Sequence, residues 1–130
     1  MKTLVVDDDV TCRLILQIFF SRYGACHMAE NGRKGIEAFS REKDAGQRYN
    51  LICLDIMMPE VDGHTVLRAI RASETVDGIP VASRAKIIMT TSHKGYADIV
   101  EAREQSCDAY LIKPVKTAKL PGLLQSLGLL

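Results

Sequence analysis

Acidic, hydroxyl and amino side chains stand directly after short apolar segments of this 130-residue sequence, where buried β-strands would end. The group consists of Asp7, Asp8, Asp9, Asp55, Thr90, Thr91 and Lys113. Clustered carboxylates repel one another and stay ionised together at neutral pH only with a cation between them, which indicates a hard divalent ion. Mg²⁺ fits best, because it needs few carboxylates and leaves one of them free as a nucleophile toward phosphorus. With lysine and threonine to contact phosphoryl oxygens, the set predicts phosphoryl transfer onto an aspartate.

A parallel sheet would bring these residues together. Continuous apolar segments at 3–6, 51–54, 87–90 and 109–112 predict strands buried on both faces, and the weaker segment 25–28 predicts an edge strand. Ligands of open α/β sheets bind beyond the carboxyl ends of such strands, which is where the acidic, hydroxyl and amino groups stand.

Helical patterns alternate with the strands. Their apolar positions are Cys12, Ile15, Leu16, Phe19 and Tyr23; Ile36 and Phe39 after a cap at Asn31; Val66, Leu67 and Ile70; Ile99 to Ala102; and Leu120, Leu123, Leu124 and Leu127. The last helix is expected to be capped by Thr117, with Pro121 in its first turn. Five strand–helix pairs predict an α/β domain with helices on both faces of the sheet. The polar connection 73–85 is expected to be a flexible loop on the edge far from the site.

Four motifs, in this order and spacing, resemble the receiver domain of two-component response regulators. They are Val5-Val6-Asp7-Asp8, the segment 54–63 that contains Asp55 and ends in Asp62-Gly63, Thr91, and Tyr110-Leu111-Ile112-Lys113-Pro114. The resemblance implies a flavodoxin-like (βα)5 three-layer sandwich with sheet order 2-1-3-4-5. It further implies a single receiver domain over residues 1–130 with no output domain.

The resemblance also implies roles at the site. Asp55 would accept a phosphoryl group from a phosphohistidine of a sensor histidine kinase or phosphotransfer protein. Asp7, Asp8 and Asp55 would hold Mg²⁺, or Mn²⁺ in its place, with the backbone carbonyl of Met57, and Lys113 would pair with the phosphoryl oxygens. The domain would catalyse only its own phosphorylation and dephosphorylation, so it would not be an enzyme that turns over a substrate.

A switch is implied as well. Thr91 would hydrogen-bond the phosphoryl group and Tyr110 would turn inward, which remodels the face made by the fourth helix, fifth strand and fifth helix. Thr91 is preferred to Thr90 because it stands 22 residues before Lys113, the interval typical of the family. The Lys113–Pro114 peptide bond would be cis. Met57 and His93 stand where such domains tune the lifetime of the phosphoryl group.

Composition bounds the partners. The formal net charge of +1 argues against direct nucleic-acid binding, and no apolar run is long enough to span a membrane. The four separated cysteines are typical of packing residues in a cytoplasmic protein, and the three histidines share no metal-ligand spacing, so surface or edge positions are expected for them. The resemblance implies an output protein as partner and a monomer, with a phosphorylation-linked dimer also compatible. Leu14 and Ile18 are either buried at a helix edge or part of a docking patch for the phosphodonor.

Three alternative functions compete with this interpretation. Val5 to Thr11 also satisfies the first motif of haloacid-dehalogenase-type phosphatases, with Asp7 as nucleophile and Asp9 as acid, although no acidic residue follows Lys113. A receiver fold can also serve as an unphosphorylated protein-binding module, but such domains usually lack one of the essential groups. Flavin binding is disfavoured because an acidic turn follows the first strand, where a flavin phosphate needs hydroxyls and amides.

Overall fold

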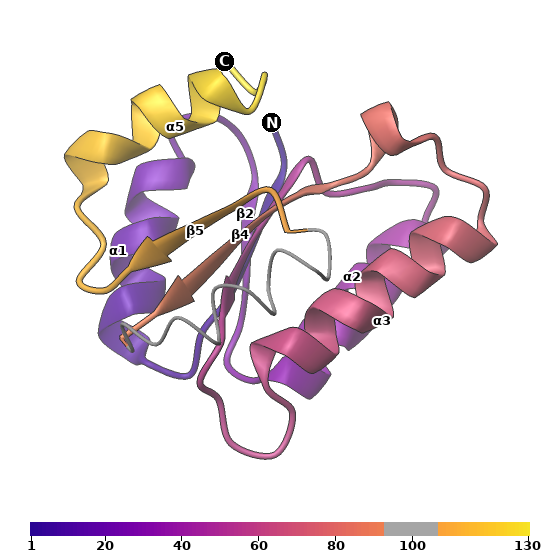
Figure 1. The fold of residues 1–130 in the computed structure, drawn as a ribbon, viewed down its shortest axis with the longest axis horizontal. Helices are drawn as coiled ribbons and strands as arrows, with labels where there is room; N and C mark the ends of the chain where they lie inside the picture. The colour runs from indigo at the N-terminus through magenta and orange to yellow at the C-terminus, as the bar shows by residue number, and fades with distance from the viewer. Residues whose placement is uncertain (93–106) are drawn as a thin grey trace.

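A computed structural model describes residues 1–92 and 107–130 of the chain. Five parallel strands form one sheet in the order β2-β1-β3-β4-β5, as predicted (Figure 1). The strands are β1 (Thr3–Val6), β2 (Cys26–Ala29), β3 (Leu51–Asp55), β4 (Lys86–Thr91) and β5 (Ala109–Ile112).

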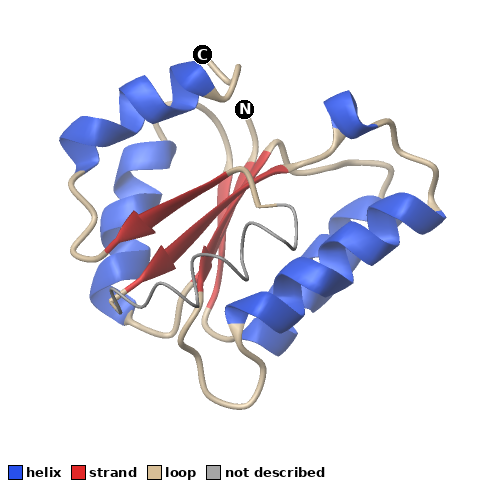
Figure 2. Cartoon of the chain, viewed as in Figure 1, coloured by secondary structure: helices blue, strands red, loops and turns tan. Residues whose placement is uncertain are grey.

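Helices cover both faces of this sheet. The α-helices are α1 (Val10–Phe20), α2 (Gly32–Asp44), α3 (Gly63–Val76) and α5 (Leu120–Ser126), with single 3₁₀ turns at Val81–Ser83 and Thr117–Lys119. Helices α1 and α5 lie on one side and α2 and α3 on the other, which gives the three layers expected (Figure 2). The helix expected around Ile99 to Ala102, and His93, lie outside the described residues. Among the described residues, no helix is long and apolar enough to cross a membrane.

The three central strands alternate between two apolar cores. Leu4, Ile52 and Ile87 pack in the core beneath α2 and α3. Val5 and Ile88 pack in the core on the other face, beneath α1 and α5. All five side chains are fully buried, so the prediction of strands buried on both faces is confirmed for β1, β3 and β4.

The prediction fails for β5, which is an edge strand, as β2 is at the other end. The residues of β5 are only partly buried, and Ile112 is exposed. A continuous apolar segment indicates a strand, but it does not show whether that strand lies in the middle or at the edge of the sheet.

Helix α1 presents a different face to the core from the one predicted. Leu16, Phe19 and Phe20 are buried, but Ile15, placed on the core stripe by its spacing, is 44% exposed. The buried face of α1 is therefore shifted toward Phe20 and away from Ile15.

Two helix starts follow the sequence signals and one does not. Asn31 caps α2 by accepting a hydrogen bond from Lys34 N (2.8 Å), as predicted, and Asp62 caps α3 by accepting one from Thr65 N (2.9 Å). Thr117 does not cap α5: it begins a 3₁₀ turn, and α5 starts one turn later at Leu120. Pro121 still falls in the first turn of α5, where a missing N–H costs little.

The expected loop at 73–85 is largely ordered secondary structure. Helix α3 continues through Val76, and a 3₁₀ turn spans Val81–Ser83. Glu74, predicted to lie in a polar loop, is buried because its carboxylate accepts hydrogen bonds from Arg71 and from Ala85 N. The segment does lie beside the start of β4, at the end of that strand opposite the candidate site.

The histidines and cysteines differ in burial. His64, expected near the surface, is buried in the first turn of α3, where the helix packs closely on the end of β3. His27 lies on the edge strand β2, as expected, and its Nδ1 is 2.7 Å from the Tyr49 hydroxyl. The four cysteines are free; Cys53 is buried and the other three are partly buried.

Candidate functional site

Three carboxylates meet at the carboxyl ends of β1 and β3. Carboxylate oxygens of Asp7, Asp8 and Asp55 all lie within 4.8 Å of one another. Asp7 is 1% exposed and Asp55 3% exposed, whereas Asp8 is exposed to solvent. The sheet order brings them together, because β1 and β3 are hydrogen-bonded neighbours with Val6 opposite Leu54. Two buried carboxylates next to an exposed one form an oxygen-lined site open to water on one side.

Lys113 supplies the positive charge of this cluster. Its Nζ lies 2.8 Å from Asp7 Oδ2 and 3.3 Å from Asp55 Oδ2. Lys113 directly follows β5, and its backbone N–H donates to Thr91 O (2.7 Å), which fixes the start of its side chain beside the end of β4. The peptide bond between Lys113 and Pro114 is cis.

Burial and the neighbouring carboxylate of Asp7 disfavour the ionised form of Asp55. Burial raises the pKa of Asp55 to about 7, and the charge of Asp7 acts in the same direction, while Lys113 opposes both. Burial would lower the pKa of Lys113, but the hydrogen bond from its ammonium to Asp7 and the charges of Asp55 and Asp7 outweigh it, so this pKa is raised. One lysine therefore does not neutralise the carboxylates, and the donor set fits a further hard cation.

The loop after β3 holds Asp55 in place. Met57 N donates to Asp55 Oδ1 (3.3 Å), and Gly63 N donates to Ile56 O (2.9 Å). A Cβ on Gly63 would lie 2.4 Å from the carbonyl oxygen of Asp55, so only glycine allows α3 to begin this close to the strand end. The Asp62-Gly63 pair thus caps α3 and sets how near the helix approaches Asp55.

Asp9 follows Asp7 and Asp8 in the sequence but caps a helix. Its side chain is the N-cap of α1 and accepts hydrogen bonds from Thr11 N (2.8 Å) and Cys12 N (3.4 Å). These two backbone hydrogen bonds lower the pKa of Asp9. An ionised carboxylate engaged with a helix terminus is a poor proton donor, which disfavours the phosphatase alternative that needs Asp9 as an acid.

Thr91 and Tyr110 lie on the same face of the sheet. Thr91 is fully buried. It lies two residues after Met89 and four after Ile87 on β4, so it shares their face of the sheet, which is covered by α2 and α3. Tyr110 packs against that same core and stands opposite Met89 on β5, so Thr91 is its diagonal neighbour. Thr90 lies on the other face, and its hydroxyl donates to Leu54 O (3.4 Å). The register therefore places Tyr110 on the same face as Thr91 rather than on that of Thr90.

The apolar side chains on the outer face of α1 are exposed. Leu14 is 46% and Ile18 67% exposed, so burial at a helix edge, one of the two interpretations open for them, is wrong. Ile15 and Val10 extend the exposed surface along the same helix. A shallow groove of about 190 Å³ runs from Ile15 and Ile18 toward Thr117. We call Val10, Leu14, Ile15 and Ile18 the α1 patch.

Two residues at the site were not singled out from the sequence. Arg13 donates from its guanidinium to the carbonyl oxygen of Asp7 (2.7 Å) and so holds the turn that carries the acidic residues. Its position in the first turns of α1 is the only sequence signal for this contact. Gly63 belongs to one of the sequence motifs, but its close approach to Asp55 depends on tertiary packing and is not visible in the sequence.

The family model described as the response regulator receiver domain matches residues 3–125 of the chain. The chain belongs to this family. It is therefore a receiver domain of two-component signalling, a family of regulators. Chemotaxis protein CheY1 of Helicobacter pylori (strain J99) is 33% identical to this receiver domain over 114 residues, which cover 88% of this chain and 86% of CheY1.

Other relatives are longer than this receiver domain. The uncharacterized transcriptional regulatory protein YclJ of Bacillus subtilis is 33% identical over 115 residues, which are 88% of this chain but 44% of YclJ. The probable transcriptional regulator ycf27 of Cyanophora paradoxa is 32% identical over 97% of this chain and 47% of its own length. The chain thus spans less than half of these two relatives.

Solved structures share the fold. The receiver domain of histidine kinase CKI1 from Arabidopsis thaliana, complexed with Mg²⁺ and BeF₃⁻, aligns with a TM-score of 0.83 at 22% identity over 98% of this chain and 89% of that one. Chemotaxis protein CheY4 of Vibrio cholerae aligns with a TM-score of 0.78 at 23% identity over 97% of both chains. At these identities the likeness establishes the flavodoxin-like topology.

Proposed function

We propose that Asp55 accepts a phosphoryl group from a phosphohistidine of a sensor histidine kinase or phosphotransfer protein, and that this modification switches the domain. The observation that carries the proposal is the cluster in which Asp7, Asp8 and Asp55 lie within 4.8 Å of one another with the Lys113 ammonium between two of them. Asp55 is the central member, since it ends a strand between β1 and β4 and contacts Lys113.

Mg²⁺, or Mn²⁺ in its place, would be held by the carboxylates of Asp7, Asp8 and Asp55 and by the backbone carbonyl of Met57. The donor set fits, because these are hard oxygen ligands and three carboxylates face a single ammonium, that of Lys113. When bound, the ion neutralises charge on the carboxylates and on the incoming phosphoryl oxygens. The CKI1 receiver domain of the same fold was solved with Mg²⁺ and BeF₃⁻.

The chemistry then falls to this chain's own side chains. A carboxylate oxygen of Asp55 forms a bond to phosphorus while the bond from phosphorus to the donor's imidazole nitrogen breaks, and the imidazole keeps the electron pair and takes up a proton. Lys113, already 3.3 Å from Asp55 Oδ2, pairs with the phosphoryl oxygens and orients the nucleophile. Catalysis here consists of positioning and charge stabilisation. The domain does not turn over a substrate, because the phosphoryl acceptor is its own Asp55.

The switch would run through Thr91 and Tyr110. The phosphoryl group draws in the Thr91 hydroxyl, and because Tyr110 is the diagonal neighbour of Thr91 on the same sheet face, its ring follows inward. Tyr110 also lines a groove of about 260 Å³ with Ile112, Val115 and Lys119. Movement of the ring changes the shape of this groove, which is the surface offered to an output protein.

The α1 patch would receive the phosphodonor. Leu14 and Ile18 are exposed on the helix that begins directly after the acidic turn, so a helical partner lying along them brings its histidine near Asp55. Exposed apolar side chains in one row on a helix are typical of surfaces that bind another helix.

Incubation with acetyl phosphate and Mg²⁺, followed by intact-protein mass spectrometry, tests the proposal. We expect a gain of one phosphoryl group that is lost in Asp55→Asn and on chelation of the metal. Asp9→Asn is the matched control: asparagine still caps α1, so this variant should be labelled like the wild type. Failure of the wild type to gain mass would favour the unphosphorylated binding module, and steady release of phosphate that depends on Asp9 would favour the phosphatase.

A further inference from the structure

A second pocket lies at the opposite end of the sheet from Asp55. It has a volume of about 430 Å³, and its described lining comes from the end of α3, the α3–β4 connection and the starts of β4 and β5. Strand β4 runs from Lys86 in this pocket to Thr91 at the candidate site, a distance of roughly 17 Å at about 3.3 Å per residue. The pocket is therefore separate from the phosphorylation chemistry.

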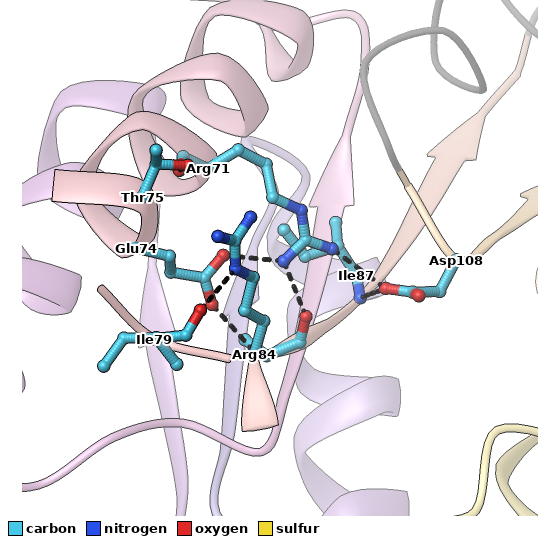
Figure 3. Close-up of polar contacts among 8 residues, drawn as sticks. Arg71, Glu74, Thr75, Ile79, Arg84, Ile87 and Asp108 are labelled. Carbon is cyan, nitrogen blue, oxygen red and sulfur yellow. Dashed lines mark hydrogen bonds and ion pairs between the residues drawn. The ribbon is translucent and has the colours of Figure 1, made fainter. Parts of the chain in front are cut away.

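An ionic network centred on Arg71 and the buried Glu74 lies beside this pocket, and Figure 3 shows its contacts. The Arg71 guanidinium contacts Glu74 Oε1 (2.7 Å), Ala85 O (2.8 Å) and Asp108 Oδ2 (3.0 Å). Asp108 Oδ2 also accepts a hydrogen bond from Ile87 N (2.7 Å), and Glu74 Oε2 accepts one from Ala85 N (2.8 Å). The network ties α3 to the starts of β4 and β5, and its two carboxylates exceed the charge of Arg71 by one negative charge.

Two further cations, Arg84 and Lys86, line the pocket. Arg84 donates from Nε to Ile79 O (3.0 Å), which holds the base of its guanidinium against the α3–β4 connection. Within residues 1–92 and 107–130, neither the terminal nitrogens of Arg84 nor the Lys86 ammonium has a hydrogen-bond or ion-pair partner. In Figure 3 the terminal nitrogens of Arg84 accordingly carry no dashed line. Among the described residues, three cations (Arg71, Arg84 and Lys86) thus face two carboxylates (Glu74 and Asp108), which leaves a net positive charge, and the Arg84 guanidinium is fixed at Nε.

We propose that this pocket binds a small organic phosphate through Arg84 and Lys86. The net positive charge favours an anionic ligand, and a phosphate monoester carries a charge of about −2 near neutral pH. A guanidinium fixed at Nε with free terminal nitrogens has the geometry for two parallel hydrogen bonds to phosphate oxygens. The volume of 430 Å³ lies in the range of small-molecule sites and leaves room for an organic body beside the phosphate.

The test is a two-dimensional NMR titration of the full chain with AMP, with adenosine and with inorganic phosphate, all without divalent cations. We expect AMP to shift the amide signals of Ala85, Lys86 and Asp108 at the pocket, and adenosine to leave them unchanged. Shifts confined to the surroundings of Lys113 would overturn the proposal, because the phosphate would then occupy the site at Asp55. Inorganic phosphate that binds as tightly as AMP would overturn the assignment of an organic ligand.

Matched variants separate a site from general charge attraction. Arg84→Gln and Lys86→Gln should each weaken AMP binding about tenfold or more, as expected for the loss of a charged hydrogen bond. Arg33→Gln removes the same charge from an exposed position on α2 and should leave the affinity unchanged. An equal loss in Arg33→Gln would contradict a defined pocket. Lys86→Gln guards against a folding defect, because no side-chain hydrogen bond or ion pair of Lys86 is lost among the described residues.

Discussion

Replacement of Asp55 by asparagine should stabilise the protein when divalent cations are absent. In the folded state the pKa of Asp55 is raised from 3.8 to about 7, chiefly by burial and then by the charge of Asp7. The ionised carboxylate is therefore destabilising in the fold. The penalty is absent well below pH 3.8, grows as the pH rises and is complete above about pH 7. Asparagine carries no charge and avoids it.

The size of the effect follows from the same values. A pKa raised from 3.8 to about 7 corresponds to an upper limit of about 4 kcal/mol, since one pKa unit is about 1.4 kcal/mol. At pH 5 the penalty would be only about 2 kcal/mol, because the folded-state carboxyl is then largely protonated. Urea unfolding in EDTA at the two pH values, followed by far-ultraviolet circular dichroism, measures the difference. Mg²⁺ should raise the stability of the wild type more than that of Asp55→Asn.

Asp77→Asn is the matched control for this prediction. The same change at Asp77 should destabilise the protein at pH 8, because hydrogen bonds from Lys43 and Arg48 lower the pKa of that carboxyl. An Asp55→Asn variant that is no more stable than the wild type at pH 8 in EDTA would refute the argument that burial and the charge of Asp7 make the ionised Asp55 carboxylate destabilising.

Three further variants test other parts of the account. Leu14→Ser with Ile18→Ser should slow phosphoryl transfer from a donor protein about three- to tenfold while labelling by acetyl phosphate stays unchanged; equal losses in both assays, or in the distant exposed control Val76→Ser, would contradict docking on the α1 patch. Arg71→Met should lower the free energy of unfolding by about 3 kcal/mol, because it removes the cation paired with a carboxylate that is only 1% exposed; a loss below about 1 kcal/mol in urea unfolding would show that the pair is not important. Gly63→Ala should cost about 1–3 kcal/mol and slow labelling of Asp55, since its Cβ would lie 2.4 Å from the Asp55 carbonyl oxygen; unchanged stability and labelling would contradict the close approach.

The sheet and the cluster could be predicted because they depend on local signals. Strands β1, β3 and β4 are marked by consecutive apolar residues, and parallel strands align their carboxyl ends, so Asp7 and Asp55 had to lie near each other. Asp9 was harder to assign. An acidic residue after a strand is compatible with metal binding, acid catalysis or helix capping, and only the hydrogen bonds from Thr11 N and Cys12 N identify the cap.

The other wrong predictions of burial concern residues whose environment is set by tertiary packing. Ser73 to Val76 looked like a loop because the segment is polar, but Glu74 is buried by a partner on the same helix and by Ala85 N across the connection. Phe20 rather than Ile15 is buried beside Leu16 and Phe19, and Ile112 is exposed because the sheet ends at β5. None of these contacts leaves a periodic pattern in the sequence.

The central claim is that Asp55 is the phosphorylated residue. Reduction of the acetyl phosphate-treated protein with borohydride converts an aspartyl phosphate to homoserine, and peptide mass spectrometry then locates the modified position. We predict homoserine at position 55 only, formed in the presence of Mg²⁺ and absent after chelation. Homoserine at position 7 instead, as expected for a phosphatase with Asp7 as nucleophile, would contradict the account.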